Sequence, residues 1–331
     1  MKKVLKASLP FLLMILLVIP FAACSKEKMQ TVRVAEVTRS IFYAPQYVAL
    51  AKGFFKEEGL KVDLKTTWGG DKTMTALLSN GADIALVGSE TSIYVYARGS
   101  NDPVINFAQL TQTDGTFLVS RKKIDHFTWD QLQGKTFLGQ RKGGMPQMVG
   151  EYVLKKHGIV PEKDVKLIQN IDFANVANAF ASGTGDFVQL FEPTASIMEK
   201  EGKGYIVASF GSESGHVPYT TFMTKNSYIK SNKATIDKFT RAIYRAQQWV
   251  DSHSAEETAK VIQPFFKDTD TELLATVVDR YKKQESFATD PVLGKKEWNN
   301  LKNIMKEAGE LPKDVPHKIL VDTEIAKNAM K

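Results

Sequence analysis

The sequence is short of cysteine and histidine. Cys24 is the only cysteine among 331 residues, so no internal disulfide can form and the fold must be held by packing and hydrogen bonds. The few histidines have none of the spacings typical of metal ligands. They are His126, His157, His216, His253 and His317. We therefore expect neither a metal site nor a cofactor.

Catalytic and nucleic-acid signatures are missing as well. The chain has no G-x-S-x-G elbow, no P-loop and no paired-carboxylate motif, so we expect a binding protein and not an enzyme. Its net charge of +7 comes from lysines and arginines interleaved with acids, without a basic run. This pattern gives no support to a nucleic-acid partner.

The first residues have the pattern of an export signal. Met1–Lys6 carries three lysines and no acid, and Ala7–Ile19 is an apolar segment too short to span a bilayer comfortably. The stretch Phe21-Ala22-Ala23-Cys24 then resembles a lipoprotein signal, in which the cysteine is lipidated and the peptide before it is removed.

This resemblance implies a membrane-anchored protein. We expect a signal peptide at residues 1–23, lipid on Cys24 and a polar tether over residues 24–30. No apolar stretch of spanning length follows Cys24. Two or more acyl chains on Cys24 would hold the protein stably at the extracytoplasmic face of the cell membrane.

One stretch of the sequence occurs a second time in similar form. Leu77–Thr91 returns in similar form as Phe180–Thr194. Each copy has the pattern of a helix end, a turn of small residues, an aspartate before a short apolar strand, and a polar cluster that begins the next helix. Because ligands bind at such strand-to-helix junctions in open α/β sheets, two copies predict two sheets with a cleft between them.

Two blocks resemble a known family. The first is Tyr43-Ala44-Pro45 with Val48–Phe55 and Glu58–Val62, and the second is Ala76–Ala85. Both are similar to the solute-binding proteins of ABC importers, in the branch that takes nitrate, sulfonates, taurine and thiamine pyrimidine precursors. A relative of this fold is an enzyme with a cysteine-rich stretch, which this chain lacks.

The resemblance implies an α/β fold of type II periplasmic-binding-protein form, with two doubly wound lobes joined by two crossover segments. Lobe I would comprise residues 31–118 and 220–331, and lobe II residues 119–219. Lys233–His253 is amphipathic, so we expect a helical C-terminal tail that packs on lobe I. We expect a monomer that closes around a small ligand by a hinge motion and delivers it to ABC permease subunits.

The candidate ligand-binding residues lie at helix starts, whose free N–H groups hold polar or anionic groups, and at loop positions with aromatic side chains. Each of them also suits an ordinary turn or core position. They are Ser40, Tyr43, Trp68, Gly69, Gly70, Ser89, Glu90, Thr91, Gly143, Gly144, Met145, Glu192 and Tyr219.

Two acids among these candidates favour one ligand class. If Glu90 and Glu192 face the cleft, they would repel a sulfonate or nitrate and suit an amine or another hydrogen-bond donor. With aromatic walls, this favours a small nitrogen heterocycle such as a pyrimidine. The alternatives are a small oxyanion, held by helix starts and by Arg39 or Arg141, or a sensor lipoprotein without a transport role.

Overall fold

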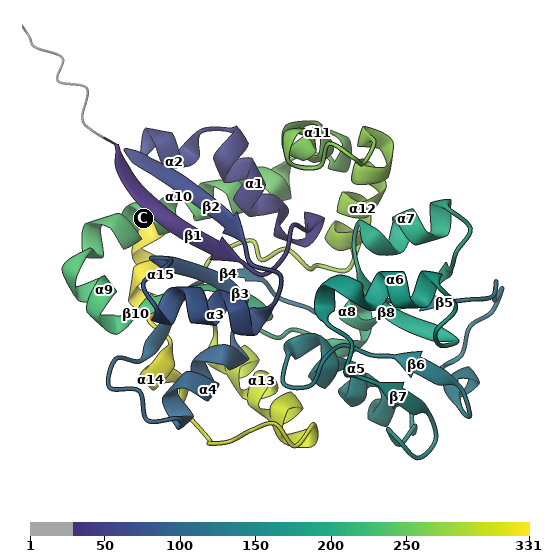
Figure 1. Ribbon diagram of the computed structural model, residues 1–331. Helices are drawn as coiled ribbons and strands as arrows, with labels where there is room; N and C mark the ends of the chain where they lie inside the picture. Colours follow the sequence, from purple (N-terminus) through teal and green to yellow (C-terminus); the bar gives the residue numbers. More distant parts are fainter. Residues whose placement is uncertain (1–28) are drawn as a thin grey trace, which may run out of the picture.

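The computed structural model describes residues 29–331. The expected signal peptide, Cys24 and most of the expected tether lie outside the described residues. The described chain forms two five-stranded sheets, which lie side by side with helices around them (Figure 1). In this part of the chain, no helix is both long enough and apolar enough to cross a membrane.

The first sheet has the strand order β2-β1-β3-β10-β4. Strands β1, β2 and β3 run parallel, whereas β10 is antiparallel to β3 and β4. The apolar residues of β3 are buried, as in a strand that is covered on both faces. The strand bounds are Gln30–Glu36 for β1, Leu60–Thr66 for β2, Ile84–Gly88 for β3, Val104–Thr111 for β4 and Thr220–Lys225 for β10.

The second sheet repeats this arrangement with the order β7-β6-β8-β5-β9. Strands β6, β7 and β8 are parallel, and β5 is antiparallel to β8 and β9. The bounds are Thr116–Ser120 for β5, Thr136–Leu138 for β6, Lys166–Ile168 for β7, Phe187–Phe191 for β8 and Tyr205–Ser209 for β9. The expected α/β class with two sheets is therefore confirmed.

The repeated stretch occupies equivalent places in the two sheets. Strand β3 follows Asp83 and β8 follows Asp186, and each is the central strand of its sheet. The two aspartates also act alike, because each accepts a hydrogen bond of 2.9 Å from the backbone N–H of a neighbouring strand, at Arg33 and at Thr136. The sequence repeat thus marks a structural repeat.

The chain passes between the sheets in two segments, residues 112–115 and 210–219. Residues 116–118, which we expected in lobe I, belong to the second sheet because Phe117 pairs with Leu190 and Ser209. The two segments bind each other where Val217 N–H donates to the carbonyl oxygen of Gln112 at 2.9 Å.

Helices cover the sheets and form the C-terminal region. Around the first sheet they are α1 (Ala44–Ala51), α2 (Phe54–Glu57), α3 (Gly70–Leu78) and α4 (Glu90–Ala97). Around the second they are α5 (Met145–Lys156), α6 (Val176–Ala181), α7 (Thr194–Lys200) and α8 (Phe210–Ser214). The short 3-10 turns are η1 (Ile41–Tyr43), η2 (Trp129–Leu132), η3 (Phe173–Asn175) and η4 (Gln263–Phe265). The C-terminal helices are α9 (Asn226–Ser231), α10 (Lys233–Ser252), α11 (Ala255–Ile262), α12 (Thr271–Lys283), α13 (Lys295–Glu307), α14 (His317–Leu320) and α15 (Thr323–Ala329).

The C-terminal helices contact both sheets and their helices. Helix α10 packs on α1, as expected for a tail on the first sheet, and buries Ile236, Phe239 and Ile243. Helices α12 and α13, however, lie along the boundary between the two halves (Figure 1). Helix α13 contacts α5, and the amide of Asn300 on α13 donates to the carbonyl oxygen of His216. The tail therefore packs on the first half, as expected, and also contacts the second half through α13.

Candidate ligand-binding cleft

A cavity of about 190 Å³ lies between the two sheets, where strand ends and helix starts of both halves meet. From the first half, its wall includes the ends of β1 and β3 and the starts of α3 and α4. From the second half, it includes the loop between β6 and α5 and the end of β8. Nine of the expected ligand-binding residues line it: Tyr43, Gly69, Gly70, Glu90, Thr91, Gly143, Gly144, Met145 and Tyr219.

The other four expected residues lie elsewhere. Ser40, Trp68 and Glu192 line a second cavity beside the first. Ser89 lines neither cavity, since its hydroxyl donates to the carbonyl oxygen of Pro218 and its N–H to that of Tyr219. Ser89 therefore holds the return segment in place and does not face the first cavity.

Sequence reasoning missed several wall residues. Phe173 begins η3, Phe191 ends β8 and Tyr94 lies one turn into α4, and all three line the first cavity. Phe191 directly precedes Glu192 in the repeated stretch, so its position at a strand end was the signal that could have identified it. Phe173 and Tyr94 carried no comparable signal, because their helical positions look like ordinary core positions.

Glu90 is the buried acid of the first cavity. Only 3% of its surface is exposed, and burial raises the pKa of its carboxyl to about 8, although the backbone N–H groups of Glu90 and Met145 act in the opposite direction. Its Oε2 has no hydrogen-bond partner among the described residues. The carboxyl folds back over Gly88, where any side chain would collide with it.

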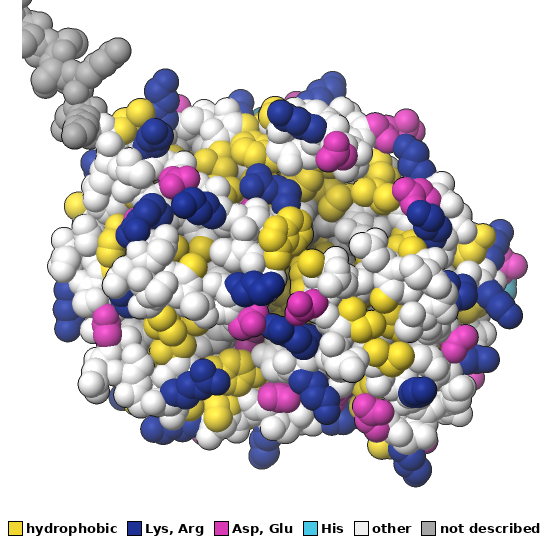
Figure 2. Space-filling model, in the orientation of Figure 1, with side chains coloured by type: hydrophobic (Ala, Val, Ile, Leu, Met, Phe, Trp, Pro, Cys, Tyr) yellow, Lys and Arg dark blue, Asp and Glu magenta, His cyan; other side chains and the backbone are white. Residues whose placement is uncertain are grey.

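The charged groups at the rim of the cavity pair with each other. Arg141 Nη2 lies 2.7 Å from Asp71 Oδ1, and this ion pair joins the loop before α5 to the start of α3. The other nitrogen, Arg141 Nη1, lies 3.4 Å from Asp172 Oδ1. These side chains are about half exposed. Figure 2 shows Lys and Arg side chains beside Asp and Glu side chains around the recess between the two halves.

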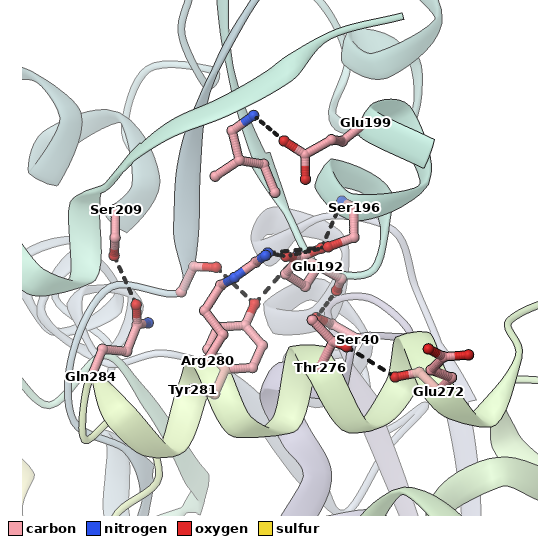
Figure 3. Close-up of polar contacts among 12 residues, drawn as sticks. Ser40, Glu192, Ser196, Glu199, Ser209, Glu272, Thr276, Arg280, Tyr281 and Gln284 are labelled. Atoms are coloured by element: carbon pink, nitrogen blue, oxygen red, sulfur yellow. Dashed lines mark hydrogen bonds and ion pairs between the residues drawn. The ribbon is translucent and has the colours of Figure 1, made fainter. Parts of the chain in front are cut away.

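Glu192 has its own partners within the protein (Figure 3). Its buried carboxylate forms an ion pair with Arg280 of α12 and accepts hydrogen bonds from Ser196, at 2.9 Å from the N–H and 2.8 Å from the hydroxyl. Its backbone carbonyl accepts from Ser40 at 2.6 Å. Burial raises the pKa of Glu192, and the positive charge of Arg280 opposes that shift. Glu90 is thus the buried acid of the first cavity whose Oε2 has no hydrogen-bond partner in the described chain.

Tyr219 links the cavity wall to the crossing segments. It is 3% exposed, and its hydroxyl has no hydrogen-bond partner in the described chain. Its N–H donates to the carbonyl oxygen of Thr111 at 3.2 Å. The neighbouring Asp114 is completely buried in the first crossing segment, and this burial raises the pKa of its carboxyl to about 6.

The fold and the cavity define a class of protein. Two mixed sheets of the same topology, joined by two crossing segments and enclosing a cavity, form the periplasmic-binding-protein architecture, in which a small molecule is held between two halves. Across residues 29–331 there is no group of three or more metal-binding side chains.

The chain belongs to the NMT1/THI5-like family, whose model matches residues 41–257. It is similar to a protein of Bacillus subtilis (strain 168) described as "Putative binding protein YtlA", with 68% identity over 314 residues that cover 95% of this chain and 94% of the other. Together with the fold, this makes the protein a binding protein of periplasmic-binding-protein form and not an enzyme.

Solved structures of low identity share the fold. The alkanesulfonate-binding protein SsuA from Xanthomonas axonopodis pv. citri, bound to MOPS, aligns with a TM-score of 0.70 at 17% identity, covering 88% of this chain and 98% of that chain. The nitrate-binding protein NrtA from Synechocystis PCC 6803 aligns with a TM-score of 0.72 at 18% identity, covering 91% and 88%.

Proposed function

We propose that the protein is a lipid-anchored receptor that captures a small amine or amino-substituted nitrogen heterocycle and delivers it to an ABC permease. The observation that carries this proposal is the unpaired Oε2 of Glu90 at the cavity wall. A buried polar atom without a partner destabilises a protein by roughly 1–3 kcal/mol. A ligand that donates an N–H to Glu90 would remove this penalty.

The protonation of Glu90 fits such a ligand in two ways. With a pKa of about 8, the carboxyl is mostly protonated at neutral pH and offers one donor and one acceptor. These two groups complement a ring nitrogen next to an amino group. A cationic amine would instead bind the carboxylate and displace the proton.

The aromatic wall supports a flat ligand. Phe191 lies 6.0 Å from Phe173 and 6.5 Å from Tyr219, measured between ring centroids, and all three line the cavity. Aromatic rings contribute large apolar contact areas and favour stacked or edge-on contacts with other rings. A planar heterocycle would stack on these rings and form hydrogen bonds with Glu90.

A small oxyanion is the second candidate, because Arg141 and Lys142 line the cavity near the start of α5. Against it, Arg141 already pairs with Asp71 and Asp172. A bound sulfonate or nitrate would also have to lie near the buried carboxyl of Glu90, which disfavours anions whenever that group is ionised.

Calorimetry on the mature protein tests the proposal. The ligands are 2,4-diaminopyrimidine, benzylamine, methanesulfonate and nitrate, and we expect the tightest binding with one of the first two. Glu90→Leu, which can neither donate nor accept a hydrogen bond, should weaken that binding by about 1–3 kcal/mol, because it leaves the polar groups of the ligand unpaired in the cavity. Glu57→Leu, at a surface ion pair with Arg245, is the matched control and should leave the affinity unchanged.

The opposite ranking contradicts the proposal. If methanesulfonate or nitrate binds most tightly, or if Glu90→Leu has no more effect than Glu57→Leu, the oxyanion alternative is favoured and Glu90 does not contact the ligand.

A further inference from the structure

A second cavity of about 180 Å³ adjoins the first. The two cavities share four wall residues: Thr38, Gln140, Phe173 and Phe191. The second cavity is nearly as large as the first, at about 180 Å³ against about 190 Å³. The site between the two halves is therefore large enough for two linked rings.

Most of the wall that the second half contributes to the second cavity is apolar. Ala174, Val176 and Ala177, from η3 and α6, form it together with Leu190 and Phe191 of β8. The polar residues on this side are Gln140, Glu192 and Thr194. The apolar part of the wall favours an uncharged group.

The two charged residues of this cavity already have partners. Arg39 Nε lies 3.0 Å from Glu36 Oε1, and its guanidinium lies over the ring of Tyr47. The carboxylate of Glu192 is paired with Arg280. Because both charges are compensated inside the protein, the cavity offers neither of them to a ligand.

Trp68 lies on the opposite wall, on the side of the first half. It is 48% exposed, and its backbone is in the left-handed region with a φ of 58°. This conformation is an outlier for a bulky residue, and such conformations are concentrated at ligand-binding and other functional positions. The fold therefore presents an indole ring at the opening between the halves at the expense of backbone strain.

We propose that the second cavity is a subsite for a flat, uncharged group that stacks on Trp68 and is linked to the amino-bearing ring at Glu90. The ligand class is thus a nitrogen heterocycle carrying a second planar group. This inference rests on the proposed function, since it takes Glu90 as the anchor of the first ring.

Two probes that differ only in the second ring test this subsite. They are 2,4-diaminopyrimidine and 5-benzyl-2,4-diaminopyrimidine, measured by calorimetry and by tryptophan fluorescence on the mature protein. In the wild type we expect the benzyl compound to bind at least ~10-fold more tightly, the effect of one stacked ring on binding, and to change the fluorescence. In Trp68→Ala the two affinities should agree within about twofold, since the stacking partner is gone. Trp68→Phe, which keeps a ring, should retain part of the gain.

Trp249→Phe is the matched control, because Trp249 stacks on His253 and lines neither cavity. This variant should keep both the gain in affinity and the change in fluorescence.

The outcomes separate the two claims. If the benzyl compound binds no more tightly than 2,4-diaminopyrimidine, or if its advantage persists in Trp68→Ala, the subsite is refuted while the proposed function stands. If neither compound binds, the subsite is refuted, and if benzylamine does not bind either, the proposed function fails with it.

Discussion

The hydroxyl of Ser40 donates a hydrogen bond of 2.6 Å to the backbone carbonyl of Glu192. Ser40 follows β1 in the first sheet and Glu192 follows β8 in the second, so this bond ties one strand end to the other across the cleft. We expected both residues to bind ligand from opposite walls. They contact each other and both line the second cavity. Helix α12 completes the junction through Arg280 and through Tyr281, whose hydroxyl donates to the Gly115 carbonyl at 2.8 Å.

Loss of Arg280 should destabilise the protein strongly. Arg280→Met leaves the Glu192 carboxylate buried without its cation, and removing one partner of a buried ion pair typically costs 3–5 kcal/mol. Because the Arg280 side chain is 28% exposed, we expect about 2–3 kcal/mol. Urea denaturation followed by circular dichroism measures this change. The double variant Arg280→Met/Glu192→Gln should recover part of the loss, and a single variant as stable as the wild type would show that the ion pair contributes nothing.

Glu90 should make the stability of the unliganded protein depend on pH. Its pKa in the folded state is about 8, above the ordinary value of 4.5, so the folded state holds the extra proton between these values. The contribution to stability is therefore complete below about pH 4.5 and is lost as the pH rises through about 8. Between pH 5 and 8 the wild type should lose stability relative to Glu90→Gln, as measured by urea denaturation at each pH. A difference that stays constant with pH would contradict the raised pKa.

Arg141 should contribute more to the closure of the two halves than to direct contact with the ligand. Arg141→Ala removes its ion pair with Asp71 across the rim, and exposed pairs contribute only about 0.2–1 kcal/mol. We therefore expect calorimetry to show at most a ~5-fold loss of affinity for the preferred ligand. Lys123→Ala, which removes an exposed ion pair with Asp125 and lines neither cavity, is the control. A loss beyond 100-fold for Arg141→Ala alone would mean that Arg141 binds the ligand directly, as an oxyanion ligand requires.

Cys24 should determine where the protein is found in the cell. If it carries the lipid, Cys24→Ser should move the protein from the membrane fraction to the soluble extracytoplasmic fraction, because stable anchoring needs acyl chains. Immunoblots of both fractions measure this shift, with Ser25→Ala as a control that keeps the cysteine. Continued membrane association of Cys24→Ser would exclude the lipid anchor.

The repeated stretch shows how far the sequence could lead. Its strand pattern correctly predicted a short buried strand in each of two sheets, because burial on both faces demands short apolar runs such as Ile84–Val87. Its last positions were less informative. Glu90 and Glu192 look alike in sequence, but Glu192 meets Arg280, which comes from a helix 88 positions further along the chain.

The sequence by itself therefore determined the family, the two sheets and nine residues of the cavity wall, since local patterns at strand ends and helix starts encode these features. Only the tertiary structure decided which acid remains unpaired, where α12 joins the halves, and that Trp68 faces a second cavity. These features depend on contacts between residues distant in the chain, and no local pattern of residues specifies which distant partner neutralises a buried charge.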